Sequence, residues 1–195
     1  MKFSHIKLCL GSASPRRAEL LKQIGVNFEV RVASIDESIH GEENAADYVL
    51  RMAIDKARRV WQKNQGTTLA GLPVLAADTA VVLGDWIMGK PTDREQGVEM
   101  LTALSGRTHE VLTSVSLLQA EKQVSRLSRS EVTFAPLSEA DINRYWETGE
   151  PLDKAGAYAI QGKAAVFIES LKGSYSGVMG LPLFEVGHLL EEMDI

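Results

Sequence analysis

The chain has 195 residues, of which 45% are hydrophobic and 24% charged, and its formal net charge at pH 7 is −5. This composition is typical of a globular protein with a substantial core, and it excludes disordered and fibrous chains. The net negative charge disfavours a broad nucleic-acid-binding surface, because such a surface depends on positive charge.

Cysteine usage and apolar runs bear on the compartment. Cys9 is the one cysteine of the sequence, so an intramolecular disulfide and a cysteine-based metal site are both excluded, and a reducing compartment is expected. The apolar residues 6–10 precede Arg16 and Arg17, whereas an export signal has its basic residues first. No apolar run approaches the roughly 20 residues that cross a bilayer. We therefore expect a soluble, cytoplasmic protein with one domain, residues 1–195.

A strand followed by a helix opens the chain. Residues 6–11 are apolar and predict a buried strand. Ser14 and Pro15 can then begin a helix as its N-cap and first residue, and Gly25 can end it. The start of such a helix presents backbone N–H groups and the positive end of the helix dipole, so this loop favours anions.

Two further elements lead to a central strand. Residues 28–33 alternate in polarity and predict a second strand, and Asn44 can cap a long helix with an apolar face. Residues 74–83 form an apolar run that is interrupted only by Asp78 and Thr79. This pattern predicts a central strand that ends or bends at a polar pair.

The second half of the sequence continues to alternate between helices and strands. The expected elements are a helix from a capping box at Thr92 and Glu95, a hairpin of residues 111–117 and 124–134, a short helix from Ser138, a strand at 166–171 and a last helix from Pro182. We therefore predict a mixed α/β fold, with flanking helices around one twisted sheet.

Two arginines in the first turn of the first helix are the first candidates for chemistry. Arg16 and Arg17 are electrostatically unfavourable at a helix N-terminus unless an anion is bound there. Their forked guanidinium groups suit phosphate oxygens. An ordinary helix cap with a solvated arginine pair is an equally good interpretation of these residues alone.

A carboxylate inside the apolar strand is the second candidate. Asp78 would be costly to bury unless it were paired, bound to metal or placed at the strand end. It could hold a divalent cation or accept a proton from water, or it could bond to nearby backbone. Glu37, Lys56 and Lys90 are weaker candidates, because a surface loop, a helix face and a turn explain each of them better than a functional role does on the residues alone.

Other common catalytic patterns are missing from the sequence. It has no Walker-type phosphate loop and no zinc-binding pattern. The histidines are scattered outside the loops considered above, so we interpret them as structural and disfavour a Ser/His/Asp hydrolase. They are His5, His40, His109 and His188.

Taken together, these motifs resemble the Maf family. The segments that carry the resemblance follow the family's order between Leu8 and Leu190, and they are residues 12–17, 77–79, 89–91, 104–106, 153–158, 161–162 and 177–182. The resemblance implies an elongated α/β fold like that of inosine-triphosphate pyrophosphatases, with two lobes around a cleft and frequent homodimers. It also implies hydrolysis of a nucleoside triphosphate between its α and β phosphates, with Mg²⁺ or Mn²⁺ as cofactor.

The resemblance further assigns roles to individual residues. Glu37 and Asp78 would hold the metal or the attacking water, and Asp78 would be the proton acceptor. The residues that would bind the phosphates are Ser12, Arg16, Arg17, Lys56 and Lys90.

Base selectivity follows from three positions of the same resemblance. Arg16, Thr79 and Gln161 match the subgroup that cleaves dTTP and UTP, whereas a subgroup acting on 7-methyl-GTP carries Trp, Gln and Glu there. The amide of Gln161 can both donate and accept, which suits the edge of a neutral uracil or thymine. The alternatives are a 7-methyl-GTP pyrophosphatase and a nucleotide-sensing or division-regulating binding protein. We expect a nucleotide partner and neither nucleic acid nor membrane.

Overall fold

The computed structural model describes residues 2–195, which divide into two units. Unit 1 consists of Met1–Asp78, Thr113–Ser128 and Gly180–Ile195, and unit 2 of Thr79–Leu112 and Arg129–Met179. Hydrogen bonds join seven strands in the order β2-β1-β3-β5-β6-β7, and β4 pairs with β3. Strands and helices mix along the whole chain, as predicted for an α/β fold.

Unit 1 contains the strand–helix segment that opens the chain. Its elements are β1 (Lys7–Leu10), α1 (Pro15–Gln23), β2 (Asn27–Val30), α2 (Ala45–Asn64), the first half of β3 (Val74–Leu83), α6 (Leu183–Glu192) and the parts of β5 (Thr108–Gln119) and β6 (Lys122–Phe134) that lie within Thr113–Ser128. β1 is parallel to both β2 and β3, and Cys9 lies opposite Val74. Leu10, the last residue of β1, lies opposite Leu75, so the loop after β1 lies beside the following residues of β3, around Asp78.

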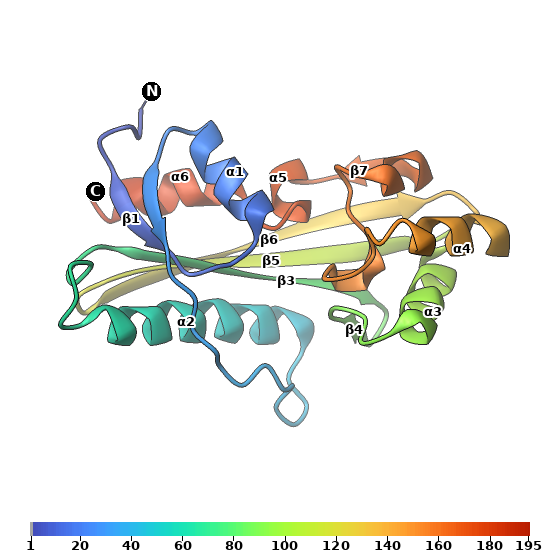
Figure 1. The fold of residues 1–195 in the computed structure, drawn as a ribbon, viewed down its shortest axis with the longest axis horizontal. Helices are drawn as coiled ribbons and strands as arrows, with labels where there is room; N and C mark the ends of the chain where they lie inside the picture. The colour runs from blue at the N-terminus through green and yellow to red at the C-terminus, as the bar shows by residue number, and fades with distance from the viewer. Residues whose placement is uncertain (1) are drawn as a thin grey trace. The chain divides into compact units, whose positions relative to one another are not determined.

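Helices cover both faces of these strands. Cys9, Val74 and Ala76 pack against Ala57 and Val60 of α2. Successive strand residues point to opposite faces, so their neighbours face the other way. Figure 1 shows α1 and α6 on the side of β3 away from α2. Burial on both faces explains why the sequence of β1 and β3 is an almost continuous apolar run.

The helices of unit 1 begin where the sequence predicts. Asn44 caps α2 by accepting a hydrogen bond from the backbone N–H of Asp47. Ser14 occupies the N-cap position of α1 with Pro15 after it, but the Ser14 side chain makes no capping bond. The Ser14 N–H instead donates to the hydroxyl of Ser12, at 3.2 Å. The loop before α1 is therefore held by Ser12.

Unit 2 contains the second half of β3, parts of β5 and β6, and a group of short elements. These are β4 (Trp86–Met88), α3 (Arg94–Leu104), β5 (Thr108–Gln119), β6 (Lys122–Phe134), α4 (Glu139–Glu147), the 3₁₀ helices η1 (Ala155–Ala157) and η2 (Lys163–Phe167), β7 (Ile168–Lys172) and α5 (Tyr175–Val178). α3 packs against α4 and η1. The buried cluster of this unit includes Met88, Leu101, Phe134 and Tyr158.

Two glycines of unit 2 allow close packing. A Cβ on Gly97 of α3 would overlap the indole ring of Trp146 on α4. Gly156 has a left-handed backbone with φ of 65°, and a Cβ there would lie 2.8 Å from a methyl carbon of Val81. Both positions therefore require glycine, since any side chain would push neighbouring elements apart.

The structure corrects four details of the predicted elements. β3 continues through Asp78 and Thr79 and does not end there. β2 ends at Val30 rather than at residue 33. Asp93 caps α3, one residue later than the capping box at Thr92 predicts, because the Asp93 side chain accepts from the N–H of Gln96. The fourth correction concerns residues 166–167, which belong to η2 rather than to a strand.

Two further findings concern helices. The helix α5 has no counterpart in the prediction, because Gly177 within it signals a loop rather than a helix. None of the helices in the described residues is both long and apolar enough to cross a membrane.

Candidate active site

Two carboxylates and one lysine form an ion-pair cluster in unit 1. The Nζ of Lys56 lies 2.6 Å from Oδ1 of Asp78 and 2.7 Å from Oε1 of Glu37. The side chains of Lys56 and Asp78 are 16% and 13% exposed, whereas that of Glu37 is 59% exposed. Removing such charges from water is costly even when they are paired, so the cluster is poor evidence for stability and a good candidate for function.

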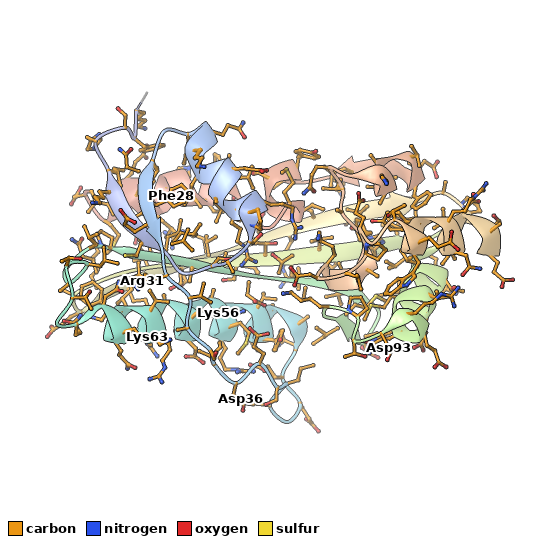
Figure 2. The ribbon with its side chains drawn as sticks, in the orientation of Figure 1. Phe28, Arg31, Asp36, Lys56, Lys63 and Asp93 are labelled. Atoms are coloured by element: carbon orange, nitrogen blue, oxygen red, sulfur yellow. The ribbon has the colours of Figure 1, made fainter. Side chains whose placement is uncertain are left out.

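Each member of this cluster comes from a different element. Asp78 lies in β3, Lys56 in the middle of α2, and Glu37 in the loop between β2 and α2. Figure 2 shows Lys56 on α2 and Asp36 in that loop. The tertiary fold of unit 1 thus brings together three residues that the sequence treats as separate, weak candidates.

The loop that carries Glu37 is anchored to α2 at two points. Arg51 forms a bidentate ion pair with Glu43, with nitrogen–oxygen distances of 2.7 and 2.6 Å. The Arg51 side chain also donates a hydrogen bond to the carbonyl of Ser38. The hydroxyl of Tyr48 donates to the carbonyl of Glu37 at 3.1 Å. The Glu37 backbone is therefore held by side chains from the same helix that carries Lys56.

Tyr48 is a member of the site that the sequence does not reveal. Burial, together with the nearby carboxylates of Asp78 and Glu37, raises the pKa of Tyr48 to about 12. The phenol therefore stays protonated and remains a donor. In the sequence, Tyr48 fits the apolar face of a predicted helix, so its aromatic ring hides the role of its hydroxyl.

Arg17 joins the loop after β1 to the middle of β3. Its Nη1 donates to the hydroxyl of Ser12 at 3.1 Å and to the carbonyl of Ala77 at 2.8 Å. Its Nε donates to the carbonyl of Gly180 at 2.7 Å. Arg17 therefore fixes the peptide group just before Asp78 as well as placing a positive charge near it.

The other predicted residues of the first motif lie beside Arg17. Ser12 is buried at the end of β1, where its hydroxyl receives hydrogen bonds from both Arg17 and the Ser14 N–H. Arg16 is half-buried in the same helical turn, and no acidic residue balances the first turn of α1. The first turn of α1 therefore places positive charge close to Asp78 of β3.

Unit 2 carries the remaining predicted residues. Thr79 follows Asp78 along β3 and is half-buried. Lys90 pairs with Asp153, and both side chains are well exposed. The Gly156 N–H donates to the carbonyl of Gly89 at 3.0 Å, which holds the segment after Asp153 against the Lys90 turn. The other residue is Gln161, which is exposed just before η2.

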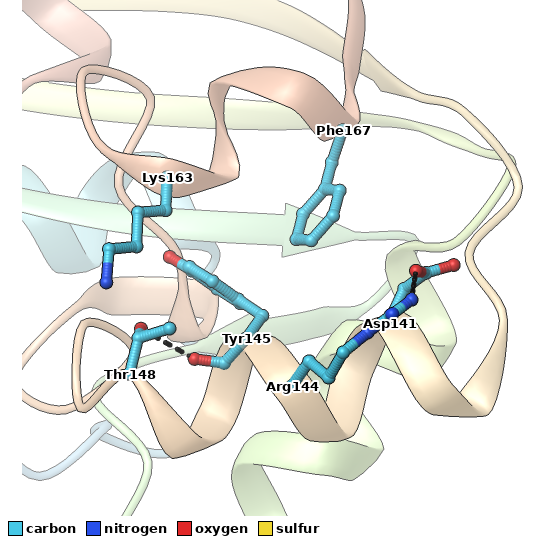
Figure 3. Close-up of a pocket in the computed structure, with 6 residues that line it drawn as sticks. All are labelled: Asp141, Arg144, Tyr145, Thr148, Lys163 and Phe167. Carbon is cyan, nitrogen blue, oxygen red and sulfur yellow. Dashed lines mark hydrogen bonds and ion pairs between the residues drawn. The ribbon is translucent and has the colours of Figure 1, made fainter.

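A shallow pocket of unit 2 contains none of the predicted site residues. It has a volume of about 220 Å³ and is lined by Asp141, Arg144, Tyr145, Thr148, Lys163 and Phe167 (Figure 3). Arg144 is paired with Asp141 at 2.6 Å, so its positive charge is compensated within the pocket lining. The ion-pair cluster around Lys56 is chemically the stronger candidate.

Comparison with known proteins agrees with the motifs. Residues 7–193 match the protein family described as Maf-like protein. The chain belongs to the Maf family. The match covers almost the whole chain and confirms the resemblance that the short motifs indicate.

Curated relatives and a solved structure extend this match. The Maf chain is 54% identical over 189 residues to the dTTP/UTP pyrophosphatase of Alkalilimnicola ehrlichii, covering 95% of this chain and 92% of that protein. It is 48% identical over 200 residues to the dTTP/UTP pyrophosphatase of Aromatoleum aromaticum, covering 98% and 97%. The Ham1 protein of Staphylococcus aureus shares its fold, with a TM-score of 0.56, 12% identity and coverage of 96% and 99%. The predicted mixed α/β fold is therefore confirmed.

Proposed function

We propose that this Maf protein is a nucleoside triphosphate pyrophosphatase that hydrolyses dTTP and UTP to the monophosphate and pyrophosphate. The observation that carries the proposal is the cluster of Glu37, Lys56 and Asp78 beside the arginine-rich start of α1. The relatives that are about 50% identical over nearly their full length, and are named dTTP/UTP pyrophosphatases, support it. A protein that only binds nucleotides would need the lysine and arginine side chains, whereas a hydrolase also uses the carboxylates.

A divalent metal, Mg²⁺ or Mn²⁺, is part of the proposal. Glu37 and Asp78 offer hard oxygen ligands, and an oxygen atom of each lies within 2.7 Å of the same Lys56 nitrogen. Residues 2–195 contain no group of three or more His, Cys, Asp and Glu side chains that could hold a metal alone. Two carboxylates that share the ion with substrate phosphates are, however, an ordinary arrangement for Mg²⁺. When bound, the metal would neutralise charge that develops on the phosphates.

The residues of the chain then have distinct tasks. Asp78 accepts the proton of the attacking water, because a carboxylate in the site can act as a general base. Arg16, Arg17 and Lys56 stabilise the negative charge that moves onto the pyrophosphate leaving group. The Ser12 hydroxyl contacts phosphate and does not attack it, since hydrolysis needs no covalent intermediate.

Selectivity for a pyrimidine rests on the sequence motifs. Arg16, Thr79 and Gln161 match the dTTP/UTP subgroup, and an amide at Gln161 can pair with the carbonyl and N–H of a neutral base. Lys90 is assigned to the phosphates on the same grounds. We further propose that the protein acts in the cytoplasm as a homodimer, with a nucleotide and neither nucleic acid nor membrane as partner. The buried free thiol of Cys9 supports a reducing compartment.

The decisive experiment is to measure pyrophosphate release from dTTP, UTP, CTP and 7-methyl-GTP with Mg²⁺ or Mn²⁺. We expect kcat/KM to be highest for dTTP and UTP. Asp78→Asn should lower kcat at least a hundredfold without unfolding the protein, because it removes the base and a metal ligand while keeping the side-chain size. Asp85→Asn, in the exposed turn between β3 and β4, is the matched control. Preference for 7-methyl-GTP, or near-native activity of Asp78→Asn, would contradict the proposal.

A further inference from the structure

A carboxylate in unit 2 anchors the segment that follows Gln161. Oε2 of Glu150 accepts a hydrogen bond from the backbone N–H of Lys163 at 2.9 Å, and its Oε1 accepts one from the N–H of Ala164 at 3.2 Å. Lys163 and Ala164 are the first two residues of the helix η2, where backbone N–H groups have no hydrogen-bond partner within the helix itself. Glu150, which lies 13 residues before Lys163 in the sequence, therefore caps the start of η2.

The same carboxylate is tied to the other end of the segment through a tyrosine. The hydroxyl of Tyr145, on α4, donates to Oε1 of Glu150 at 2.9 Å and accepts from the N–H of Ala159 at 3.2 Å. Figure 3 shows the Tyr145 ring extending from α4 toward the segment that carries Lys163. Glu150 and Tyr145 together hold the backbone at Ala159, Lys163 and Ala164, on both sides of Gln161.

Gly162 allows this approach. A Cβ on Gly162 would overlap the carboxylate of Glu150, so the absence of a side chain lets Glu150 lie directly against the backbone. The Gly162 N–H also donates to the carbonyl of Ala159 at 3.0 Å, which closes a tight turn around Gln161. Gln161 itself is exposed at the apex of that turn.

The charge of Glu150 is stabilised by its partners. Burial raises the pKa of this carboxyl, but the N–H groups of Lys163 and Ala164 and the hydroxyl of Tyr145 lower it more, so the net pKa is below the ordinary value. Burial and the contact with Glu150 raise the pKa of Tyr145, so the phenol remains the donor. A charged acceptor makes stronger hydrogen bonds than a neutral one.

We propose that Glu150, with Tyr145 as its partner, is a positioning residue that fixes the turn presenting Gln161 to the base of the substrate. This inference rests on the proposed function, because it gives Gln161 its base-reading role. Neither Glu150 nor Tyr145 contacts the base; they act by holding the backbone on both sides of Gln161. Selectivity requires that rigidity, since a donor and an acceptor must stay aligned with the base edge to discriminate.

Glu150→Gln tests the proposal with little change of shape. A glutamine cannot accept at both ends of its side chain, so at least one of the N–H groups of Lys163 and Ala164 loses its partner. We expect kcat/KM for dTTP and UTP to fall about tenfold, as for the loss of one hydrogen bond to a charged group, and the dTTP-to-CTP ratio to fall with it. Hydrogen exchange at the amides of Lys163 and Ala164 should become about tenfold faster.

A double-mutant cycle separates positioning from a general effect on folding. In a Gln161→Ala background, Glu150→Gln should change selectivity by less than about twofold, because the positioned group is gone. Glu147→Gln, on an exposed residue in the last turn of α4, is the matched control and should leave the ratio unchanged. Tyr145→Phe keeps the ring but loses the hydroxyl, and it provides a second variant should Glu150→Gln fold poorly.

The outcomes distinguish the two proposals. If the wild type releases no pyrophosphate from dTTP or UTP, the proposed function fails and the base-reading role fails with it. If the wild type is active and Gln161→Ala loses selectivity, but Glu150→Gln and Tyr145→Phe keep the wild-type dTTP-to-CTP ratio, only the positioning role is overturned. Equal effects of Glu150→Gln in both backgrounds would also overturn it.

Discussion

At the level of single residues, Lys56 supplies the positive charge that pairs with two carboxylates. Its ammonium group contacts Glu37 and Asp78, which come from a loop and a strand of unit 1. A divalent ion could take over the same task, because both carboxylates are oxygen ligands within reach of one point. Lys56 and the metal are therefore expected to substitute in part for each other, because each neutralises the same two carboxylates.

The substitution Lys56→Met tests this relation. Removing the ammonium leaves two carboxylates without their shared partner, so we expect a loss of about 1–3 kcal/mol in the free energy of unfolding, reduced from the value for fully buried pairs by partial exposure. Activity should fall at least a hundredfold. Mg²⁺ should raise the melting temperature of Lys56→Met more than that of the wild type.

Thermal unfolding with and without Mg²⁺ measures this difference. Lys63→Met is the control, because Lys63 lies on the same helix, α2, toward its C-terminal end (Figure 2), is exposed, and donates to the carbonyl of Val32 rather than to the cluster. Equal Mg²⁺ effects in the wild type and both variants would show that Glu37 and Asp78 do not bind the metal.

At the scale of elements, glycines decide how closely helices pack. Gly97 lets α3 lie directly against Trp146 of α4, whereas Gly187 of α6 has room, with the nearest atom of Phe3 3.6 Å from an added Cβ. Alanine is favoured over glycine in a helix by about 1 kcal/mol. The same substitution should therefore have opposite effects at the two positions.

We expect Gly187→Ala to stabilise the protein by up to about 1 kcal/mol. Gly97→Ala should destabilise it by about 1–3 kcal/mol, because overlap with the indole ring outweighs the gain in helix propensity. Urea denaturation of both variants gives the two signs. Trp146→Leu should relieve part of the Gly97→Ala defect, and a stabilised Gly97→Ala would show that α3 and α4 do not pack as described.

At the scale of the whole molecule, a buried histidine links stability to pH. His109 is 2% exposed and lies in an aromatic cluster with Phe134 and Tyr158. Its Nε2 is 2.8 Å from the Tyr158 hydroxyl, whereas its Nδ1 is buried without a partner. Burial lowers the pKa of His109 to about 4, so the folded protein keeps the ring neutral.

The unfolded chain binds this proton more readily than the folded one. Stability should therefore be constant above about pH 6.5 and fall between pH 6.5 and pH 4, by up to about 3 kcal/mol from this group. Urea unfolding from pH 7.5 to 4.5 measures the slope. His109→Gln should flatten the part of the slope between pH 6.5 and 5, and an unchanged slope would mean that His109 is protonated in the folded state.

The family, the alternation of helices and strands, and most helix starts could be predicted from the order of residues alone. These features depend on local chemistry: Asn44 caps α2, Pro15 begins α1, and the apolar run of residues 74–83 is buried on both faces. The motifs also named Asp78 and Arg17, because a carboxylate in an apolar strand and cations at a helix start are unusual at the level of sequence alone.

Which of these residues contact one another could not be predicted before the fold was known. Lys56 and Glu37 lie in a helix and a loop that are far from β3 in sequence, and their contact with Asp78 follows from the packing of α2 against parallel strands. The sequence does not indicate the roles of Tyr48 and Glu150. An aromatic ring on the apolar face of a helix is expected for packing, and an acidic residue in a turn is expected for solubility. Most of their partners are backbone groups, which are the same for every residue type, so these hydrogen bonds can be identified only once the chain is folded.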